Sequence, residues 1–141
     1  MSQVPFPELP LSARYALSAL LALARADGPL SAPTLATSIE VPKAFLSKVM
    51  AQLVAAELLT ATRGRGGGFR LAVDPAEIPL QRVVAAVQEN TTGPKVCAMR
   101  DQLCDEQDPC ALHDLWSIAS SPLKKLLSEV TIADLAKRAD R

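Results

Sequence analysis

Residues 58–71 have the sequence LLTATRGRGGGFRL, and this is the part of the chain that tells most about its fold. Two short strand-like runs flank a loop that contains four of the chain's six glycines. Because glycine permits the positive φ angles of tight loops, the stretch predicts a β-hairpin with Arg63 and Arg65 at its tip. A phosphate-binding P-loop is excluded, since no Lys-Ser/Thr pair follows the glycines and a strand comes next.

Three helices are predicted before the hairpin. Ser12 is expected to cap the first, Ser31 to cap a short second helix, and Pro42 to open the third. The third helix has apolar residues at spacings of three and four, which predicts its core face: Phe45, Leu46, Val49, Met50, Leu53 and Val54. Its outer face keeps small and polar residues: Lys43, Ala44, Ser47, Lys48 and Ala51. Together with the hairpin, this order predicts a winged helix-turn-helix.

The predicted third helix and hairpin tip suit double-stranded DNA. We expect Lys43 to contact phosphate, and the residues expected to contact base edges in the major groove are Ala44, Ser47 and Lys48. Arg63 and Arg65 would enter the minor groove, whose narrow A·T stretches attract arginine. Residues 11–73 contain seven basic and three acidic residues, a net charge of +4 that suits a polyanionic partner. The alternatives are a solvated helix face and a plain surface hairpin.

The second half of the chain is predicted to be helical apart from one loop. A fourth helix is expected over residues 80–88, and a helical pattern resumes at Cys110 and continues to Val130. Pro122 lies within this pattern and should kink the helix or split it in two. Thr131 and Asp134 have the spacing of a capping box, which predicts a last short helix.

Residues 112–130 are expected to form a dimerisation helix that pairs with a second copy of the chain. Its apolar contacts would come from Trp116, Leu123 and Leu127, and the alternative is that these residues belong to the core of their own chain. The expected fold class is therefore mostly α with a small β-hairpin. Its expected organisation is a flexible segment over 1–10, a winged helix-turn-helix over 11–89, a cysteine loop over 90–111, and the dimerisation and C-terminal helices over 112–141.

Composition excludes several other classes of protein. Aromatic residues make up only 4% of the 141 residues, which favours packed helices over a β-sandwich. The longest apolar stretch falls short of the roughly 20 residues that a membrane span needs, and no signal peptide is evident. We therefore expect a cytoplasmic protein without a membrane partner. A single histidine and the lack of a nucleotide motif argue against an enzyme.

Cys97, Cys104 and Cys110, followed by His113, have the spacing C-x6-C-x5-C-x2-H. Thiolates bind soft metals and the irons of iron–sulfur clusters, and a loop lets three sulfurs converge. From spacing alone, a cluster competes with three alternatives. A Cys3His zinc site would usually have closer cysteine pairs, a redox-active disulfide leaves one cysteine over, and buried inert cysteines are disfavoured in so polar a loop.

Four segments together resemble the Rrf2 family of transcription repressors: residues 11–17, 41–46, 58–71 and 78–87. The Arg-Gly-x-Gly-Gly-Gly-aromatic hairpin is the most specific of these, and the resemblance extends over about residues 11–137. It implies a homodimer on palindromic operators, formed through the long helix after the cysteines. It also implies that Arg63 enters the minor groove, and it adds Ser12 and Tyr15 to the predicted DNA contacts.

For the cysteine segment, the resemblance implies an iron–sulfur cluster held by Cys97, Cys104, Cys110 and His113. Three cysteines and the histidine suit a 2Fe–2S cluster, which we favour, whereas three cysteines and an oxygen ligand suit a 4Fe–4S cluster. The sequence thus predicts a repressor that senses iron, redox state or nitric oxide. The alternatives are a repressor of the same fold with a zinc or thiol-redox switch and, from another class, a cluster-transfer protein or enzyme.

Three positions depart from the family pattern. Glu57 stands where relatives place a helix-ending glycine, so that turn must form without glycine. Ser47 stands where the family's iron–sulfur regulator has a glutamate, so the operator of that relative cannot be assumed here. Phe45 occupies a common tyrosine position, which removes a hydroxyl contact to phosphate.

Overall fold

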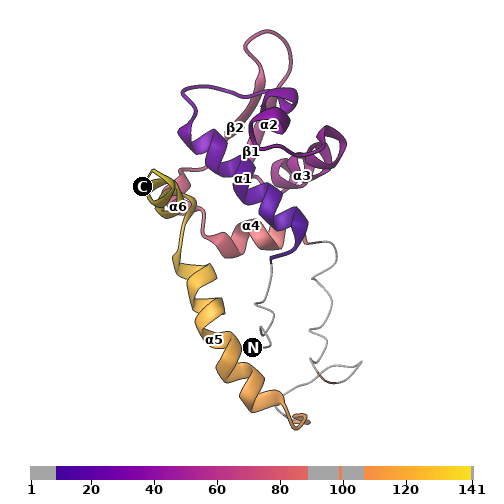
Figure 1. The fold of residues 1–141 in the computed structure, drawn as a ribbon, viewed down its shortest axis with the longest axis vertical. Coiled ribbons are helices and arrows are strands. Elements are labelled where there is room, and N and C mark those ends of the chain that lie inside the picture. Colours follow the sequence, from indigo (N-terminus) through magenta and orange to yellow (C-terminus); the bar gives the residue numbers. More distant parts are fainter. Residues whose placement is uncertain (1–8, 89–98, 100–106, 141) are drawn as a thin grey trace, which may run out of the picture.

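The computed structural model describes residues 9–88, 99 and 107–140. The elements, in order, are α1 (Leu11–Arg25), α2 (Ala32–Ser38), α3 (Lys43–Ala55), β1 (Leu59–Thr62), β2 (Gly68–Leu71), the short 3-10 helix η1 (Pro75–Glu77), α4 (Leu80–Val87), α5 (His113–Glu129) and α6 (Ile132–Ala139). The elements from α1 to α4 form one body, from which α5 extends before α6 returns to it (Figure 1). The predicted fold class, mostly α with a small hairpin, is confirmed. Within the described ranges, no helix is both long enough and apolar enough to cross a bilayer.

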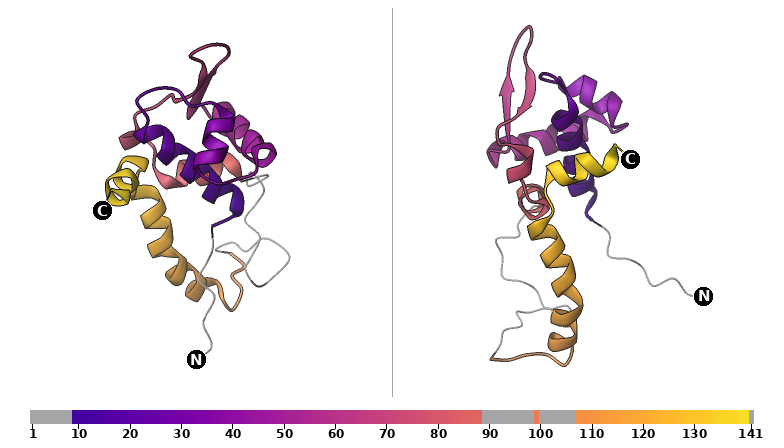
Figure 2. Two further views of the ribbon diagram at one scale, coloured as in Figure 1. Left: turned by 45° about the horizontal axis from the view of Figure 1, so that its top comes forward. Right: turned by 90° about the vertical axis from the view of Figure 1, so that its left-hand side faces the viewer.

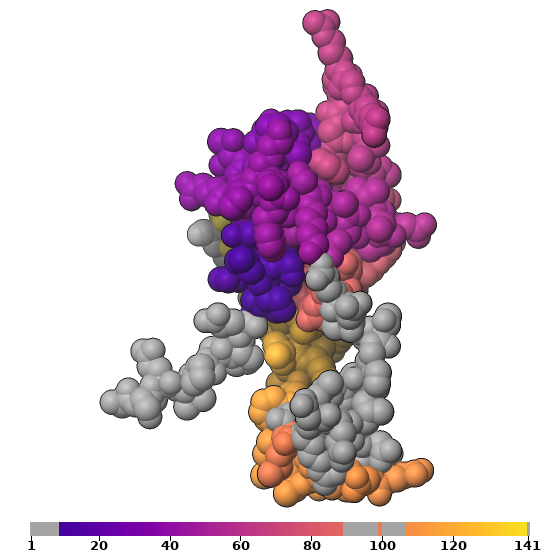
Figure 3. Space-filling view, turned by 90° about the vertical axis from the view of Figure 1, so that its right-hand side faces the viewer, coloured from indigo at the N-terminus to yellow at the C-terminus, as the bar shows by residue number. Residues whose placement is uncertain are grey.

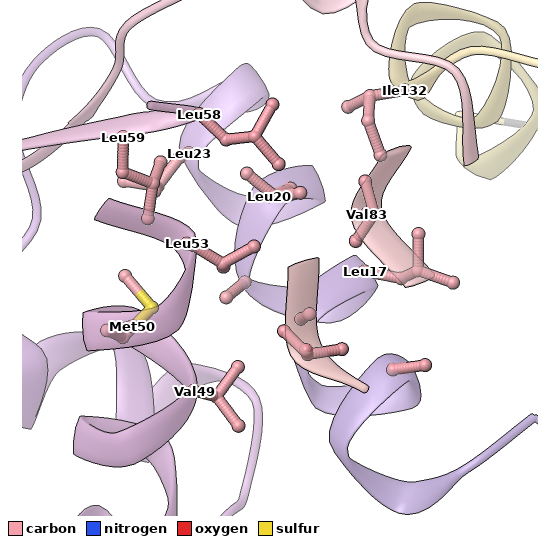
Figure 4. Packing of buried hydrophobic residues seen from close by; sticks show 14 of the residues in the cluster. Leu17, Leu20, Leu23, Val49, Met50, Leu53, Leu58, Leu59, Val83 and Ile132 are labelled. Carbon is pink, nitrogen blue, oxygen red and sulfur yellow. The ribbon is translucent and has the colours of Figure 1, made fainter. Parts of the chain in front are cut away.

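α1 is the central helix of the hydrophobic core. Three of its six buried residues are alanines, and such small side chains allow α3, α4 and α6 to pack closely around it. Leu20 of α1, Leu53 of α3 and Ile132 of α6 are fully buried members of this core (Figure 4). Full burial of one such side chain contributes about 1.5–3 kcal/mol to stability.

Two helix ends reach the left-handed backbone region without glycine. Glu57 has a φ of 62° and donates its N–H to the Val54 carbonyl at 3.0 Å. The Leu58 N–H reaches back to the Leu53 carbonyl at 3.0 Å, which completes a Schellman motif at the end of α3. The turn therefore forms without glycine, as the sequence requires. Glu40, with a φ of 54°, has the same conformation in the turn between α2 and α3.

Ser12 does not cap α1, contrary to the prediction. The helix begins at Leu11, two residues before the start that a Ser12 cap would give, with Pro10 as its N-cap and without a side-chain cap. Because the backbone is already helical at Ser12, its hydroxyl cannot accept from the first N–H groups of the helix. The other predicted caps are confirmed: Ser31 accepts a backbone N–H of α2, and Thr131 forms the capping box of α6.

The hairpin is joined to the start of α2 by backbone hydrogen bonds. β1 and β2 pair antiparallel, and Phe69 of β2 also exchanges two backbone hydrogen bonds with Leu30, at 2.8 and 3.1 Å. Gly68 has a φ of 136°, and a Cβ there would lie 2.7 Å from the Leu30 carbonyl oxygen. Only glycine permits so close an approach, so this residue fixes the base of the hairpin against the helix-turn-helix.

α5 is attached to the rest of the chain at its C-terminal end. The helix runs from His113 to Glu129 without interruption, so Pro122 does not split it. Beyond α5, the Val130 carbonyl accepts the Leu80 N–H at 2.9 Å. The Ile132 N–H in turn donates to the Ile78 carbonyl at 3.0 Å. These bonds fix the α5–α6 junction to the start of α4.

Candidate functional site

The outward face of α3 is exposed to solvent, as predicted. Its exposed residues are Lys43, Ala44, Ser47, Lys48, Ala51 and Ala55, whereas the buried face consists of Leu46, Val49, Met50 and Leu53. The Ser47 hydroxyl donates to the Lys43 carbonyl at 2.9 Å. Its proton is therefore used within the helix, and its oxygen lone pairs are left to accept hydrogen bonds.

Phe45, predicted to lie in the core, is instead 37% exposed. Its ring packs edge-to-face against Tyr15 of α1, with centroids 5.2 Å apart and an interplanar angle of 86°. Phe45 lies at the margin of the apolar face of α3, where the N-terminal part of α1 covers only one side of its ring. The pair thus joins the two helices at the protein surface, and edge-to-face contacts of this kind contribute about 0.5–1.5 kcal/mol beyond burial.

A surface groove of about 590 Å³ separates the start of α1 from α3. Ser12 from α1 and Lys48 from α3 both line it, so the structure brings these two predicted DNA contacts together. The remaining lining residues are Pro10, Leu11, Phe45, Val49, Gln52, Val87 and Gln88. Tyr15 is half-buried beside the groove through its contact with Phe45.

Arg63 and Arg65 lie in the loop between β1 and β2, and both are exposed. In the space-filling view this hairpin is a slender arm that extends beyond the body of the molecule (Figure 3). The loop closes tightly: the Gly67 N–H donates to the Gly64 carbonyl at 3.0 Å. A Cβ at Gly67 would lie 2.3 Å from the Thr62 oxygen, so the turn requires glycine there. The arm is therefore thin enough to enter a narrow groove.

Of the predicted metal ligands, Cys110 and His113 lie in the described part of the chain, and Cys97 and Cys104 lie outside it. The helix was predicted to resume at Cys110, but α5 begins at His113 and Cys110 belongs to the turn before it. This turn holds the two residues together, since the His113 N–H donates to the Cys110 carbonyl at 3.0 Å. The start of α5 lies at the end of the described molecule opposite the hairpin (Figure 2).

The described donors are compatible with a soft metal or an iron–sulfur iron. Cys110 is 7% exposed, and His113 is half-buried. The polar sequence of the loop predicts exposed thiols, but the Cys110 thiol is buried. Among the described residues, no three Cys, His, Asp or Glu side chains gather into a metal-binding group. A thiol and an imidazole from one turn could nevertheless supply two ligands of a four-ligand set.

α5 has a wide apolar surface that the described residues of its own chain leave exposed. Its large exposed apolar residues, between 41% and 70% exposed, are Leu115, Trp116, Ile118, Leu123 and Leu126. All five fall on one half of the helix surface. The sequence analysis named Trp116 and Leu123 as dimer contacts but did not name the other three. Leu127, also indicated, packs partly against the core of its own chain.

Comparison with known proteins gives consistent results. A profile of the Rrf2 family, described as iron-dependent transcriptional regulators, matches residues 11–138. An HTH-type transcriptional regulator of Azotobacter vinelandii is 32% identical over 129 residues, covering 90% of this chain and 77% of the relative. The HTH-type transcriptional regulator IscR of Photobacterium profundum is 32% identical over 126 residues, covering 88% and 72%. Among solved structures, CymR (YrzC), the global cysteine regulator of B. subtilis, shares the fold with a TM-score of 0.76 at 23% identity, over 94% of this chain and 98% of CymR.

Proposed function

The chain belongs to the Rrf2 family of transcriptional regulators, and we propose that it is a homodimeric repressor that binds a palindromic operator under the control of an iron–sulfur cluster. Family membership itself implies DNA binding and regulation of transcription, and the relatives are regulators rather than enzymes. The observation that supports the fuller proposal is the arrangement of α5. This helix has an exposed apolar side and begins at the Cys110–His113 turn. Just beyond its C-terminal end, backbone hydrogen bonds join it to the helix-turn-helix body.

DNA contact is proposed through α3 in the major groove and the hairpin tip in the minor groove. Lys43, Arg63 and Arg65 are exposed, so each can approach a phosphate or a groove without breaking a buried contact. Ser12 and Tyr15, near the start of α1, are proposed contacts with the flanking DNA backbone. The proposed base-facing residues of α3 are Ala44, Ser47 and Lys48.

Dimerisation is proposed through the apolar surface of α5. Trp116 is 57% exposed and Ile118 is 70% exposed, and an apolar surface of this kind marks a protein–protein contact. A second copy of the chain presents the same surface, so a two-fold axis would cover both helices at once. Two DNA-binding bodies related by such an axis match a palindromic operator.

The cluster is proposed to lie at the turn before α5. Cys110 and His113 would supply a thiolate and an imidazole, and Cys97 and Cys104 the other two thiolates. This ligand set favours 2Fe–2S, whereas an oxygen ligand in place of His113 would suit 4Fe–4S. When bound, the cluster supplies a group whose presence depends on iron supply and oxidation. The description of the family as iron-dependent supports this assignment.

The hydrogen bonds at the α5–α6 junction provide the proposed route from the cysteine segment to DNA. Val130 and Ile132 are bonded to Leu80 and Ile78 at the start of α4, and α4 packs against α1 and α3. A tilt of α5 would therefore move the recognition helix. In a homodimer, this movement changes the separation of the two recognition helices and alters affinity for both half-sites together.

The alternative is a repressor of the same fold with a zinc or thiol-redox switch. One observation favours it: CymR, which shares the fold, also has a solved structure from Staphylococcus aureus that is described as an oxidized form. The same cysteines would serve either switch, so chemical analysis must separate the two.

Anaerobically isolated full-length protein tests the proposal. We expect a coloured protein with iron, acid-labile sulfide and thiolate-to-iron charge-transfer absorption. We also expect salt-sensitive binding to genomic fragments that changes after oxidant destroys the cluster. Colourless protein with stoichiometric zinc would establish the alternative instead.

A variant separates a sensing role of the cysteine segment from a structural one. Cys110→Ala should lose the iron and the visible absorption but remain a folded dimer, measured by circular dichroism and sedimentation. If the dimer is lost together with the iron, the cysteine segment is a structural part of the dimer interface.

A further inference from the structure

The residues of α3 that lie opposite its buried face form a single stripe. Ala44, Lys48, Ala51 and Ala55 follow one another at spacings of four, three and four residues, opposite the buried face of the helix. All four are exposed, and three are alanines. Alanine is so short that the backbone of α3 can come close to the floor of a major groove. The few longer side chains then meet base edges directly.

This surface offers hydrogen-bond donors but almost no acceptors. Lys48 has three N–H donors and no acceptor, and the alanines present only methyl groups. Ser47 lies beside the stripe. Its hydroxyl donates a hydrogen bond to the Lys43 carbonyl, so its oxygen is left to accept one. α3, which the structure describes throughout, contains no carboxylate, and its one carboxamide, Gln52, is half-buried in the groove next to α1.

We propose that this stripe selects guanine and thymine in the operator. Lys48 donates to O6 and N7 of guanine, and the methyl groups of Ala44 and Ala51 pack on the C5 methyl of thymine. Guanine offers lysine two acceptors, whereas adenine offers only N7 beside an amino group, and cytosine presents only an amino group. Those amino groups require an acceptor, and Ser47 supplies one at a single position at most. The inference rests on the proposed function, because it requires α3 to enter the major groove.

Lys43 provides a matched control for Lys48. Both lysines are exposed on α3, but Lys43 lies in the first turn, away from the alanine stripe. A lysine that contacts phosphate weakens binding to all sequences alike and lowers the salt dependence. A lysine that contacts guanine weakens binding to its preferred sequence most, so the two roles have different signatures.

The experiment selects duplexes from a randomised library with the full-length wild-type protein, and then measures affinity for matched duplexes. Wild type is expected to select a guanine in each half-site and to lose about 10-fold in affinity when that base pair is changed. Lys48→Ala should abolish this preference. Lys43→Ala should keep it, while its affinity for every duplex falls by a similar factor. Circular dichroism confirms that both variants fold.

Thymine contact is tested on the DNA, which leaves the protein unchanged. Deoxyuridine lacks the C5 methyl, so replacing a selected thymine by deoxyuridine should weaken binding of wild type several-fold. The same replacement should have little effect on Ala44→Gly or Ala51→Gly at the position that each residue contacts.

Two outcomes would overturn the inference alone: a preference for guanine that survives in Lys48→Ala, or deoxyuridine duplexes that wild type binds as tightly as thymine duplexes. If wild type selects no sequence at all, the proposed operator binding fails, and this inference fails with it.

Discussion

α1 and α5 are the two longest helices among the described residues, and their surroundings differ completely. α1 has 15 residues and buries six of them, whereas α5 has 17 residues and buries none. Both helices have apolar residues at spacings of three and four, so the sequence pattern does not explain the difference. α1 is surrounded by α3, α4 and α6, whereas among the described elements α5 packs mainly against α4, near its own C-terminal end. An amphipathic pattern predicts that a face will be covered; it does not say by what.

The largest expected effect is on the exposed helix. In Trp116→Glu, each copy would bring a charge into the proposed dimer interface. Because the interface is two-fold symmetric, the apolar contact of Trp116 is lost twice in each dimer. We expect the association free energy to weaken by about 3–6 kcal/mol, from about 1.5–3 kcal/mol for each buried apolar side chain. Sedimentation equilibrium measures the change in dimer dissociation constant.

Ser117→Glu is the matched control for this substitution. It adds the same charge one residue further along α5, on the polar side of the helix, where Ser117 is exposed. This variant should remain a dimer. Equal dissociation of the two variants would show that added charge, and not the apolar surface, controls association.

The second prediction concerns the buried helix. Leu20 is fully buried in α1, and Leu20→Ala should lower the free energy of unfolding by about 2–5 kcal/mol because it leaves a cavity. Urea denaturation in the monomeric Trp116→Glu background measures this value without a contribution from association. Leu115→Ala, at a position that is 65% exposed on α5, should have almost no effect in the same background.

Leu127 marks the place where α5 changes from exposed to packed. This residue is half-buried against the core, so Leu127→Ala should cost about 1–2 kcal/mol in the monomeric background, less than a fully buried leucine. Urea denaturation provides the measurement. A loss as large as that of Leu20→Ala would place the boundary between the two environments nearer the N-terminus of α5.

The smallest effect is expected at the capping box that follows α5. The Thr131 backbone N–H, at 2.9 Å, and then its hydroxyl, at 3.0 Å, donate to the Asp134 carboxylate and lower its pKa. A lowered pKa in the folded state stabilises the protein above the ordinary pKa of aspartate, and this stabilisation is lost as the pH falls through the folded-state value.

Thr131→Ala removes the hydroxyl but keeps the backbone donor. The pKa of Asp134 should therefore rise only part of the way towards its ordinary value, which an NMR titration of its carboxyl carbon would detect. Asp134→Asn should eliminate this part of the acid dependence of stability. An unchanged pKa in Thr131→Ala would mean that the hydroxyl does not stabilise the carboxylate.

Much of the fold was predictable because its signals are local. Ser31 and Thr131 cap helices through bonds to residues three positions away, and the glycines of residues 64–68 form the hairpin turn through their own backbone freedom. The predictions that were wrong concern positions whose environment depends on adjacent residues or on other helices. Ser12 lost its capping role because the backbone is helical from Leu11, and Phe45 lies at the surface because only one edge of α1 reaches it.

The candidate site was predictable to a smaller extent. The outward residues of α3 and the two hairpin arginines follow from helical periodicity and from the turn itself. The relation of Cys110 to His113 did not follow, because the start of α5 cannot be read from a spacing of three residues. Nor could the sequence show that Ser12 and Lys48 line one groove, since they come from helices far apart in the chain.

By itself the sequence determined where helices and turns form, which residues each helix presents on its apolar side, and where soft ligands and basic side chains occur. These properties depend on backbone propensity and side-chain chemistry within a few residues. The return of α6, which buries Ile132 beside α1, could be seen only in the tertiary structure, as could the exposed apolar side of α5 among the described residues. Burial is a property of what surrounds a surface, and those surroundings come from elements distant along the chain.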